Sequence, residues 1–114
     1  MNTDRKVIAY KSYFLDFYKK QSDPVQAKIE WTLKLIEVTP QVPKKYFKHL
    51  EGTKGLYEVR VEVGNTIFRI FSFFDKGNLV VLGNAFLKKT QKTPKDEIEK
   101  ALKIMKEYQD EDKK

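Results

Sequence analysis

The N-terminal part of the chain combines one short β-like run with a helical pattern. Residues 6–10 (KVIAY) are apolar with β-branched members and predict a strand. Ser12 can cap a helix over residues 13–20, because the aromatic side chains that follow recur three to four positions apart and share one helix face. These aromatic residues, which we expect to pack in the core, are Tyr13, Phe14, Phe17 and Tyr18.

A longer helix is predicted over residues 24–38. Asp23 is a good N-cap residue and Pro24 suits the first helical position, whereas two prolines within residues 39–43 end the helix. Its apolar residues form two stripes, which are Val25, Ile29, Leu33 and Ile36 on one side and Trp31, Leu35 and Val38 on the other. A helix that is apolar over so much of its circumference is either covered on two sides or keeps one face for a partner.

In the second half of the chain the hydrophobic pattern changes to a period of two, which is typical of strands. Three strands are predicted, over residues 56–63, 66–74 and 79–88. The segments between them, Gly64-Asn65 and Asp75-Lys76-Gly77-Asn78, carry strong hairpin turn signals, so these strands are expected to form an antiparallel meander.

The last predicted element is a helix. Thr93 is its expected N-cap and Pro94 its first residue, and the tail after about Tyr108 is expected to fray. The apolar residues of its core-facing stripe are Ile98, Ala101, Leu102 and Met105. The order of elements predicts a small single α+β domain over residues 1–114, with an antiparallel sheet of about four strands, two N-terminal helices and one C-terminal helix.

Length and composition fit one folded domain. The chain has 114 residues, of which 40% are hydrophobic and 34% charged, a balance that argues against disorder. It has no cysteine and one histidine, so thiolate metal sites and the usual imidazole metal centres are excluded, and we expect no metal or other cofactor. There is no signal-peptide pattern and no apolar run near the about 18 residues of a membrane span, which predicts a cytoplasmic protein with no membrane partner.

The charge balance points to acidic partners. The chain has 23 Lys and Arg against 16 Asp and Glu, a net charge of +7, which makes nucleic acid or an acidic protein the first candidates. Residues 88–95 hold four lysines and no acid, and residues 44–54 hold four lysines, His49 and one acid. A solvated basic surface that only confers solubility is the alternative for both stretches.

The predicted hairpins bring distant charged residues together. The two-residue turn of the first hairpin places Arg60 directly opposite Arg69. An even-numbered turn in the second hairpin places Asn84 opposite Arg69 and puts Phe86 and Lys88 on the same face. Three cations and an aromatic ring are therefore predicted to converge there. The opposite face is the one expected to pack on helices, and it carries Tyr57, Val59, Val61, Phe68 and Ile70.

Two interpretations of the arginine pair are open at this point. Like charges opposite each other repel by roughly 1 to 3 kcal/mol at an effective dielectric between protein surface and water, so something must offset them. Glu58 and Glu62, two residues from Arg60 on the same face, can bridge the arginines into an ordinary salt-bridged surface. Alternatively, the two guanidiniums form a phosphate site, with a neighbouring phenyl ring available to stack a base.

Other candidates carry weaker signals. Histidine can serve as an acid or a base near neutral pH, but a lone loop histidine such as His49 is more often unremarkable surface. Lys89, Lys92 and Lys95 either track a nucleic-acid backbone or form a solvated connection. The chain has no phosphate-binding glycine loop, no dinucleotide fingerprint and no zinc-protease motif.

Three motifs occur in a fixed order between residues 48 and 108: LEGTKGLYEVRV at 50–61, IFRIFSFFDKG at 67–77 and FLKKTQKTP at 86–94. In combination they resemble the RelE/HigB superfamily of bacterial toxins, particularly its phage-derived branch. The resemblance implies a RelE-like fold and the toxin of a type II toxin–antitoxin system. It further implies that this toxin is an mRNA interferase, an endoribonuclease that cuts mRNA in the ribosomal A site.

The resemblance also assigns residues. Arg60 in YEVRV, Arg69 in IFRIF and Lys88 in FLKKT are the catalytic candidates. The resemblance, the strand register and the basic stretches together give the candidate RNA-binding residues, which are Lys89, Phe86, Asn84, Lys92 and His49. Lys89 is expected to point to the other face unless a bulge intervenes. Some family members place a tyrosine or histidine near the end of the last strand, where this chain reads FLKKTQK, so the general acid and base remain unassigned.

The implied RNA cleavage needs no metal, because the RNA 2′-OH is the nucleophile and fixed cations can stabilise the phosphorane. The implied partners are the ribosome with its mRNA and a HigA-like helix-turn-helix antitoxin, through which alone operator DNA would be bound. The antitoxin is expected to present an apolar helix or acidic segment against residues 24–38. Two alternatives are a ParE-like toxin, which binds DNA gyrase and cuts nothing, and a basic RNA-binding module without turnover.

Overall fold

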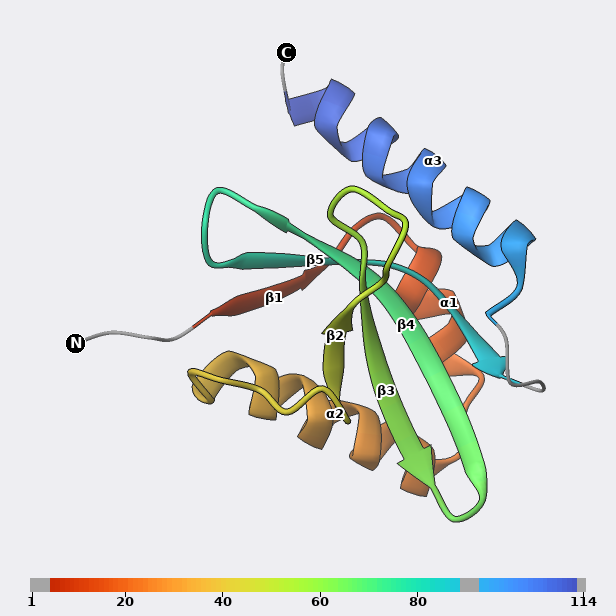
Figure 1. Ribbon diagram of the computed structural model, residues 1–114. Helices are drawn as coiled ribbons and strands as arrows, with labels where there is room; N and C mark the ends of the chain where they lie inside the picture. The colour runs from red at the N-terminus through yellow and green to blue at the C-terminus, as the bar shows by residue number, and fades with distance from the viewer. Residues whose placement is uncertain (1–4, 89–92, 113–114) are drawn as a thin grey trace.

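The computed structural model describes residues 5–88 and 93–112 as three helices and five strands. In chain order these are β1 (Lys6–Ala9), α1 (Tyr13–Lys19), α2 (Asp23–Val38), β2 (Phe47–His49), β3 (Tyr57–Val63), β4 (Thr66–Asp75), β5 (Leu79–Lys88) and α3 (Lys95–Asp112) (Figure 1). The α+β class predicted from the sequence is confirmed, and the predicted elements agree with the observed ones to within one or two residues at most ends.

The strands form one mixed sheet in the order β1-β5-β4-β3-β2. β3, β4 and β5 make the predicted antiparallel meander, but β1 pairs with β5 in parallel. The sequence pattern does not predict β2, because this strand has three residues and both Lys48 and His49 on it are exposed, so no apolar alternation marks it. The described sheet therefore has five strands rather than about four and is mixed rather than antiparallel.

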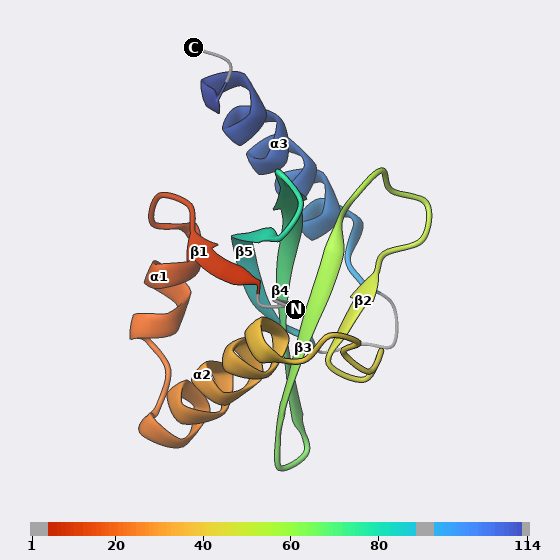
Figure 2. The same cartoon turned by 90° about the vertical axis from the view of Figure 1, so that its left-hand side faces the viewer.

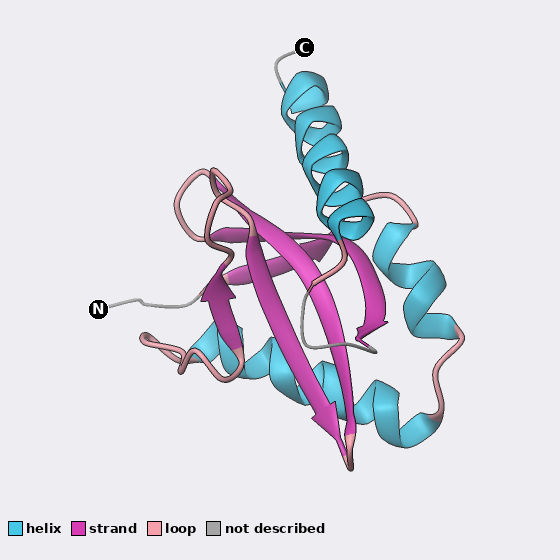
Figure 3. Cartoon of the chain, turned by 45° about the vertical axis from the view of Figure 1, so that its right-hand side comes forward, coloured by secondary structure: helices cyan, strands magenta, loops and turns pink. Residues whose placement is uncertain are grey.

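The helices cover the two faces of the sheet unequally. α1 and α2 lie together on one side, and α3 lies against the other (Figures 2 and 3). The first side buries Phe14, Ile29 and Ile36 of the helices with Val59, Val61, Phe68, Ile70, Val80 and Leu82 of the strands. The second buries Ala101 of α3 with Leu56, Phe71, Phe73, Val81 and Phe86. The face predicted to pack on helices is the one under α1 and α2, and α3 packs on β4 and β5 of the opposite face.

Helix α3 is longer than predicted at its C-terminal end. It starts at Lys95 and continues to Asp112, beyond the expected fraying point. The carboxylate of Glu107 in its last turns binds Lys11 Nζ, which lies between β1 and α1, at 2.7 Å, and the hydroxyl of Tyr13, the first residue of α1, at 2.8 Å. A hydrophobic pattern does not reveal such polar contacts between residues far apart in sequence, so the apolar stripe does not indicate the last turns of α3.

The first hairpin has the predicted register, with Arg60 opposite Arg69. The second hairpin does not. Its turn has three residues, since Asp75 pairs with Leu79, and the odd number shifts the pairing by one position.

A β-bulge then shifts the second hairpin again. Two residues of β5, Gly83 and Asn84, face the single residue Phe71 of β4, so pairing beyond this point is displaced by one more position. Phe86, not Asn84, consequently lies opposite Arg69. Because two one-residue shifts restore the alternation of side chains, the face predicted for the end of β5 is nevertheless correct.

Candidate nucleic-acid interface

Strand pairing gathers basic side chains on the sheet face opposite α1 and α2. Arg60 on β3 lies opposite Arg69 on β4. Arg69 in turn lies opposite Phe86, and Lys88 follows two positions along β5 on the same face. Lys48 on β2 lies on the same face, because its partner on β3 is Glu58, two residues from Arg60. Lys48, Arg60, Arg69 and Lys88 are called the basic cluster below.

The centre of this face is a buried ion pair between Arg69 and Glu58. Nη1 of Arg69 donates to Oε1 of Glu58, and the two side chains are 6% and 1% exposed. The hydroxyl of Thr93, the expected cap of α3, instead donates to the second carboxylate oxygen at 3.5 Å. Of the two interpretations of the arginine pair, bridging by a carboxylate therefore applies to Arg69, which Glu58 pairs. Glu62 is exposed and makes no ion pair within the described residues.

Both arginines keep hydrogen-bonding capacity that their surroundings do not use. The Nε atoms of Arg60 and Arg69 are buried and have no hydrogen-bond partner in the part of the chain that the structure describes. A guanidinium has five N–H donors in a fixed fork, and the ion pair occupies Nη1 of Arg69. Because buried donors in native proteins nearly always have a partner, these two N–H groups are exceptions among the described residues.

The charges of the basic cluster act on one another. Burial lowers the pKa of Lys88 below its ordinary value, and the charge of Arg69 lowers it further, with smaller contributions from Arg60 and Lys48 that Glu58 opposes. Burial likewise lowers the pKa of Arg69, while the charge of Glu58 acts in the opposite direction. One buried carboxylate thus faces four cations, so the cluster keeps an excess of positive charge.

Two predicted RNA-binding residues of β5 lie in the core. Phe86 is 8% exposed, and its ring packs on Phe71 with the centroids 5.3 Å apart, so it offers little surface to a base. Asn84 is 2% exposed, and its amide nitrogen donates to the backbone and carboxylate oxygens of Glu97 at 3.1 and 3.0 Å. Asn84 therefore attaches the bulge to the first turn of α3, instead of lying opposite Arg69 as predicted.

The structure places His49 apart from Arg60, Arg69 and Lys88, although His49 lines one hollow with Lys48. His49 is exposed, but it pairs with Tyr57 and so lies on the sheet face that carries α1 and α2. Its Nε2 lies 3.0 Å from the backbone oxygen of Thr53, and its ring contacts that of Tyr57. Lys89 and Lys92 lie outside the described residues.

Arg60 also lines a hollow of about 210 Å³ at the outer edge of β3. Its other lining residues come from α2, from the segment before β2 and from the end of the β3–β4 hairpin, and they are Lys28, Lys45, Tyr46, Glu62 and Gly64. Sequence reasoning missed Lys28, Lys45 and Lys48 as individual site residues. The basic stretch 44–54 is a signal for the last two, whereas nothing in the sequence connects Lys28 with Arg60.

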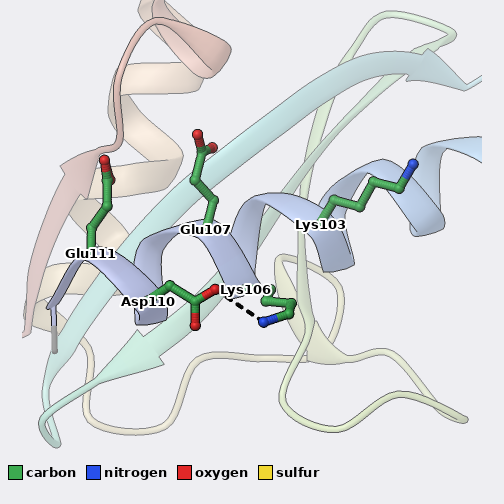
Figure 4. Close-up of a pocket in the computed structure, with 5 residues that line it drawn as sticks. All are labelled: Lys103, Lys106, Glu107, Asp110 and Glu111. Carbon is green, nitrogen blue, oxygen red and sulfur yellow. Dashed lines mark hydrogen bonds and ion pairs between the residues drawn. The ribbon is translucent and has the colours of Figure 1, made fainter.

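A further hollow, of about 460 Å³, lies along α3 and has mixed charge (Figure 4). Glu107 and Glu111 project to one side of the helix, and the Lys106–Asp110 pair, at 3.0 Å, lies on the other (Figure 4). Lys11 binds both glutamates, at 2.7 and 3.5 Å. These side chains neutralise one another and hold α3 in place, so this hollow is not a candidate anion site.

No group of three or more His, Cys, Asp or Glu side chains that could hold a metal ion occurs among residues 5–88 and 93–112. Within the same described ranges, none of the helices combines the length and the apolar character needed to cross a lipid bilayer.

Comparison with known proteins gives one clear relationship. The family model of the phage-derived Gp49-like proteins (DUF891) matches residues 16–106. No curated protein matches the chain significantly. The matched region contains all three helices in whole or in part, four of the five described strands and the whole basic cluster. The chain therefore belongs to the phage-derived Gp49-like family, which is associated with toxin–antitoxin systems.

Proposed function

We propose that the chain is the toxin of a type II toxin–antitoxin system and acts in the cytoplasm as a ribosome-dependent mRNA interferase. Membership of the Gp49-like family supports the toxin role. The resemblance of its YEVRV, IFRIF and FLKKT segments to RelE/HigB toxins supports the nuclease activity. The observation that carries the proposal is the basic cluster, in which four cations surround one buried carboxylate and two guanidinium N–H groups lack a partner in the described chain.

The proposed reaction is an in-line transfer within the RNA. The 2′-oxygen of one nucleotide attacks the adjacent phosphorus, and the bond from phosphorus to the 5′-oxygen of the next nucleotide breaks. The products are a 2′,3′-cyclic phosphate and a 5′-hydroxyl, so one proton leaves the 2′-OH and one reaches the departing 5′-oxygen. Because the RNA supplies the nucleophile, the protein needs only to orient the phosphate, stabilise its added negative charge and move protons.

The structure suggests different roles for the three catalytic candidates. Arg60 and Lys88 are partly exposed and are the groups proposed to contact the phosphate. Arg69 is nearly buried and held by Glu58, so its proposed role is that of a fixed positive charge beneath them. A lysine whose pKa is lowered exchanges protons more readily near neutral pH, and Lys88 is the proposed proton acceptor from the 2′-OH.

An antitoxin is the proposed partner that holds the toxin inactive. The HigA-like type would supply the helix-turn-helix domain for operator DNA, and an acidic segment of it would complement the excess positive charge of the cluster. Trp31 and Val38 of α2 are 48% and 47% exposed, which agrees with the expectation that one stripe of this helix is not covered by the chain itself.

The test adds the purified protein to translating ribosomes and maps the ends of the mRNA. Cleavage is expected only in the presence of ribosomes, and Arg60→Ala is expected to lower its rate about a hundredfold to a thousandfold. Lys100→Ala, which removes a charge from an exposed position on α3, is the matched control and should cleave like the wild type. Growth arrest with intact mRNA and inhibited gyrase would instead support the ParE-like alternative.

A further inference from the structure

The hollow beside Arg60 has features that the proposed cleavage chemistry does not use. Trp31, the only tryptophan of the chain, is 48% exposed, and its ring meets that of Tyr46 edge to face with the centroids 5.6 Å apart. Lys28 Nζ lies 4.3 Å from the Trp31 ring centroid, and Lys45 Nζ lies 5.4 Å from that of Tyr46. Two aromatic rings and two ammonium groups thus form one patch, and Lys28, Lys45 and Tyr46 of this patch line the hollow.

The hollow lies where the outer edge of β3 is not paired within the described structure. β2 pairs with β3 only as far as Val59, and a backbone hydrogen bond of 2.9 Å from Arg60 N–H to the Tyr46 carbonyl ends the contact. The β3–β4 hairpin then continues past β2, beside α2 (Figure 1). Only residues 61–63 of β3 remain along this edge, a length at the lower limit for a strand, which argues against an added peptide strand as the occupant.

Charge and size indicate what the hollow can hold. Lys28, Lys45 and Arg60 line it against one acid, Glu62, so an anionic ligand is favoured. Its volume of about 210 Å³ is below the roughly 300 to 1,000 Å³ of sites for whole drug-sized ligands, so it fits one unit of a polymer better. A basic groove with aromatic rings is the usual construction of sites for single-stranded nucleic acid, in which cations follow the backbone and bases stack on the rings.

We propose that this hollow binds one unpaired nucleotide of the RNA substrate, next to the phosphate contacted by Arg60. The base stacks on the Tyr46 ring, and the nucleotide's own phosphate lies between Lys28 and Lys45. Arg60 connects the two sites, because it lines the hollow and also belongs to the basic cluster. The inference rests on the proposed function for the identity of the ligand.

Trp31 provides the measurement, because it is the only tryptophan and lies against Tyr46. The probe is an octamer of uridine with 2′-O-methyl groups, which lacks the nucleophile and cannot be cut. Binding should change Trp31 fluorescence. Tyr46→Leu should weaken binding about fivefold to a hundredfold, the range for losing one stacked base, whereas Tyr46→Phe keeps the ring and should bind within about twofold of the wild type.

A second variant keeps the test independent of the fold around Tyr46. Lys28→Ala with Lys45→Ala should weaken binding at least about tenfold, and Lys100→Ala with Lys103→Ala, which removes two charges from α3, is the matched control. Equal affinities in these two double variants would overturn the proposal. The proposal would also be wrong if a double-stranded probe of the same sequence bound as tightly as the single strand, because stacking requires an unpaired base.

Ribosomal cleavage, measured separately, distinguishes this inference from the proposed function. If the wild type cuts mRNA but the Lys28, Lys45 and Tyr46 variants bind the octamer with wild-type affinity, the nucleotide site is refuted and the nuclease proposal is not. Octamer binding at these residues without any cleavage supports the site and refutes the nuclease. If the lysine double variant binds the octamer normally but loses a co-expressed antitoxin, the patch docks a protein and the nucleotide proposal is wrong.

Discussion

Arg69 and Glu58 form an ion pair that is almost fully buried, although both residues lie on the sheet face that carries the candidate site. They belong to adjacent strands, so the pair fixes the position of the guanidinium relative to Arg60, the residue opposite Arg69 in the ladder. The pairing also offsets part of the repulsion between the two arginines. Arg69 is therefore a rigid positive group rather than a mobile arm.

The first prediction concerns the free energy of unfolding. Glu58→Gln removes the carboxylate and leaves Arg69 buried without its counter-charge, which is expected to cost about 3 to 5 kcal/mol in a urea titration. Replacing both partners, as Glu58→Leu with Arg69→Met, removes both desolvation costs and should be much less harmful than either single change. A loss below about 1 kcal/mol in Glu58→Gln would mean that water reaches the pair.

The second prediction follows from the lowered pKa of Lys88. A lysine whose pKa is lower in the folded protein than in the unfolded chain costs stability while it is protonated in both states. This cost is complete below the folded pKa, shrinks as the pH rises above it and is gone above the unfolded pKa. Lys88→Met should therefore raise the free energy of unfolding at pH 7, by about 1 kcal/mol or less for a half-buried charge, and the gain should shrink toward pH 10. If the free energy of unfolding that Lys88→Met gains does not change with pH, the gain does not come from the protonation of Lys88.

A third prediction separates the charge of Lys88 from its ability to exchange a proton. Lys88→Arg keeps the positive charge but cannot release its proton in this pH range. If neutral Lys88 accepts the 2′-OH proton, the ratio of wild-type to Lys88→Arg cleavage rates should rise with pH between about 6.5 and 9 and reach about a hundredfold or more. A ratio near one at every pH would leave Lys88 with an electrostatic role only.

The fourth prediction concerns Asn84, whose amide bonds to Glu97 are structural in this account. Asn84→Ala should cost about 1 to 3 kcal/mol, because two partly buried oxygens of Glu97 lose their donor. Asn84→Asp should cost more, since it places a second carboxylate beside Glu97. Both variants should retain octamer affinity per folded molecule, as measured by Trp31 fluorescence. A loss of RNA affinity without a loss of stability would contradict the structural role and would mean that Asn84 contacts RNA.

Local sequence signals are sufficient for the start of each helix to within one residue and for the first hairpin, but not for the C-terminal end of α3. The Asp23-Pro24 pair, the period-two pattern and the two-residue turn at Gly64-Asn65 each depend on a few neighbouring residues, and the register that places Arg60 opposite Arg69 follows from that turn alone. The register of the second hairpin does not follow from local signals. Its odd turn and its bulge each change the pairing by one residue, and neither has a distinctive local signature.

The parts of the candidate site that sequence reasoning missed depend on tertiary packing. Thr93, which is far from Glu58 in sequence, contacts the buried Glu58–Arg69 pair. Periodicity alone gives Glu58 only as one of two possible bridging carboxylates. Lys28 reaches the hollow because α2 packs across β3, a contact between segments about thirty residues apart. Phe86 was placed on the correct face, but its burial against Phe71 was not visible in the sequence.

The chemistry of the cut mRNA ends tests the central claim most directly. After reaction on translating ribosomes, the account predicts 2′,3′-cyclic phosphate or 3′-phosphate on the upstream fragment and a 5′-hydroxyl on the downstream one. It also predicts that these ends become about a hundredfold rarer with Arg60→Ala and unchanged with Lys100→Ala. Ends carrying 3′-hydroxyl and 5′-phosphate, or mRNA that stays intact while the protein arrests growth, would contradict it.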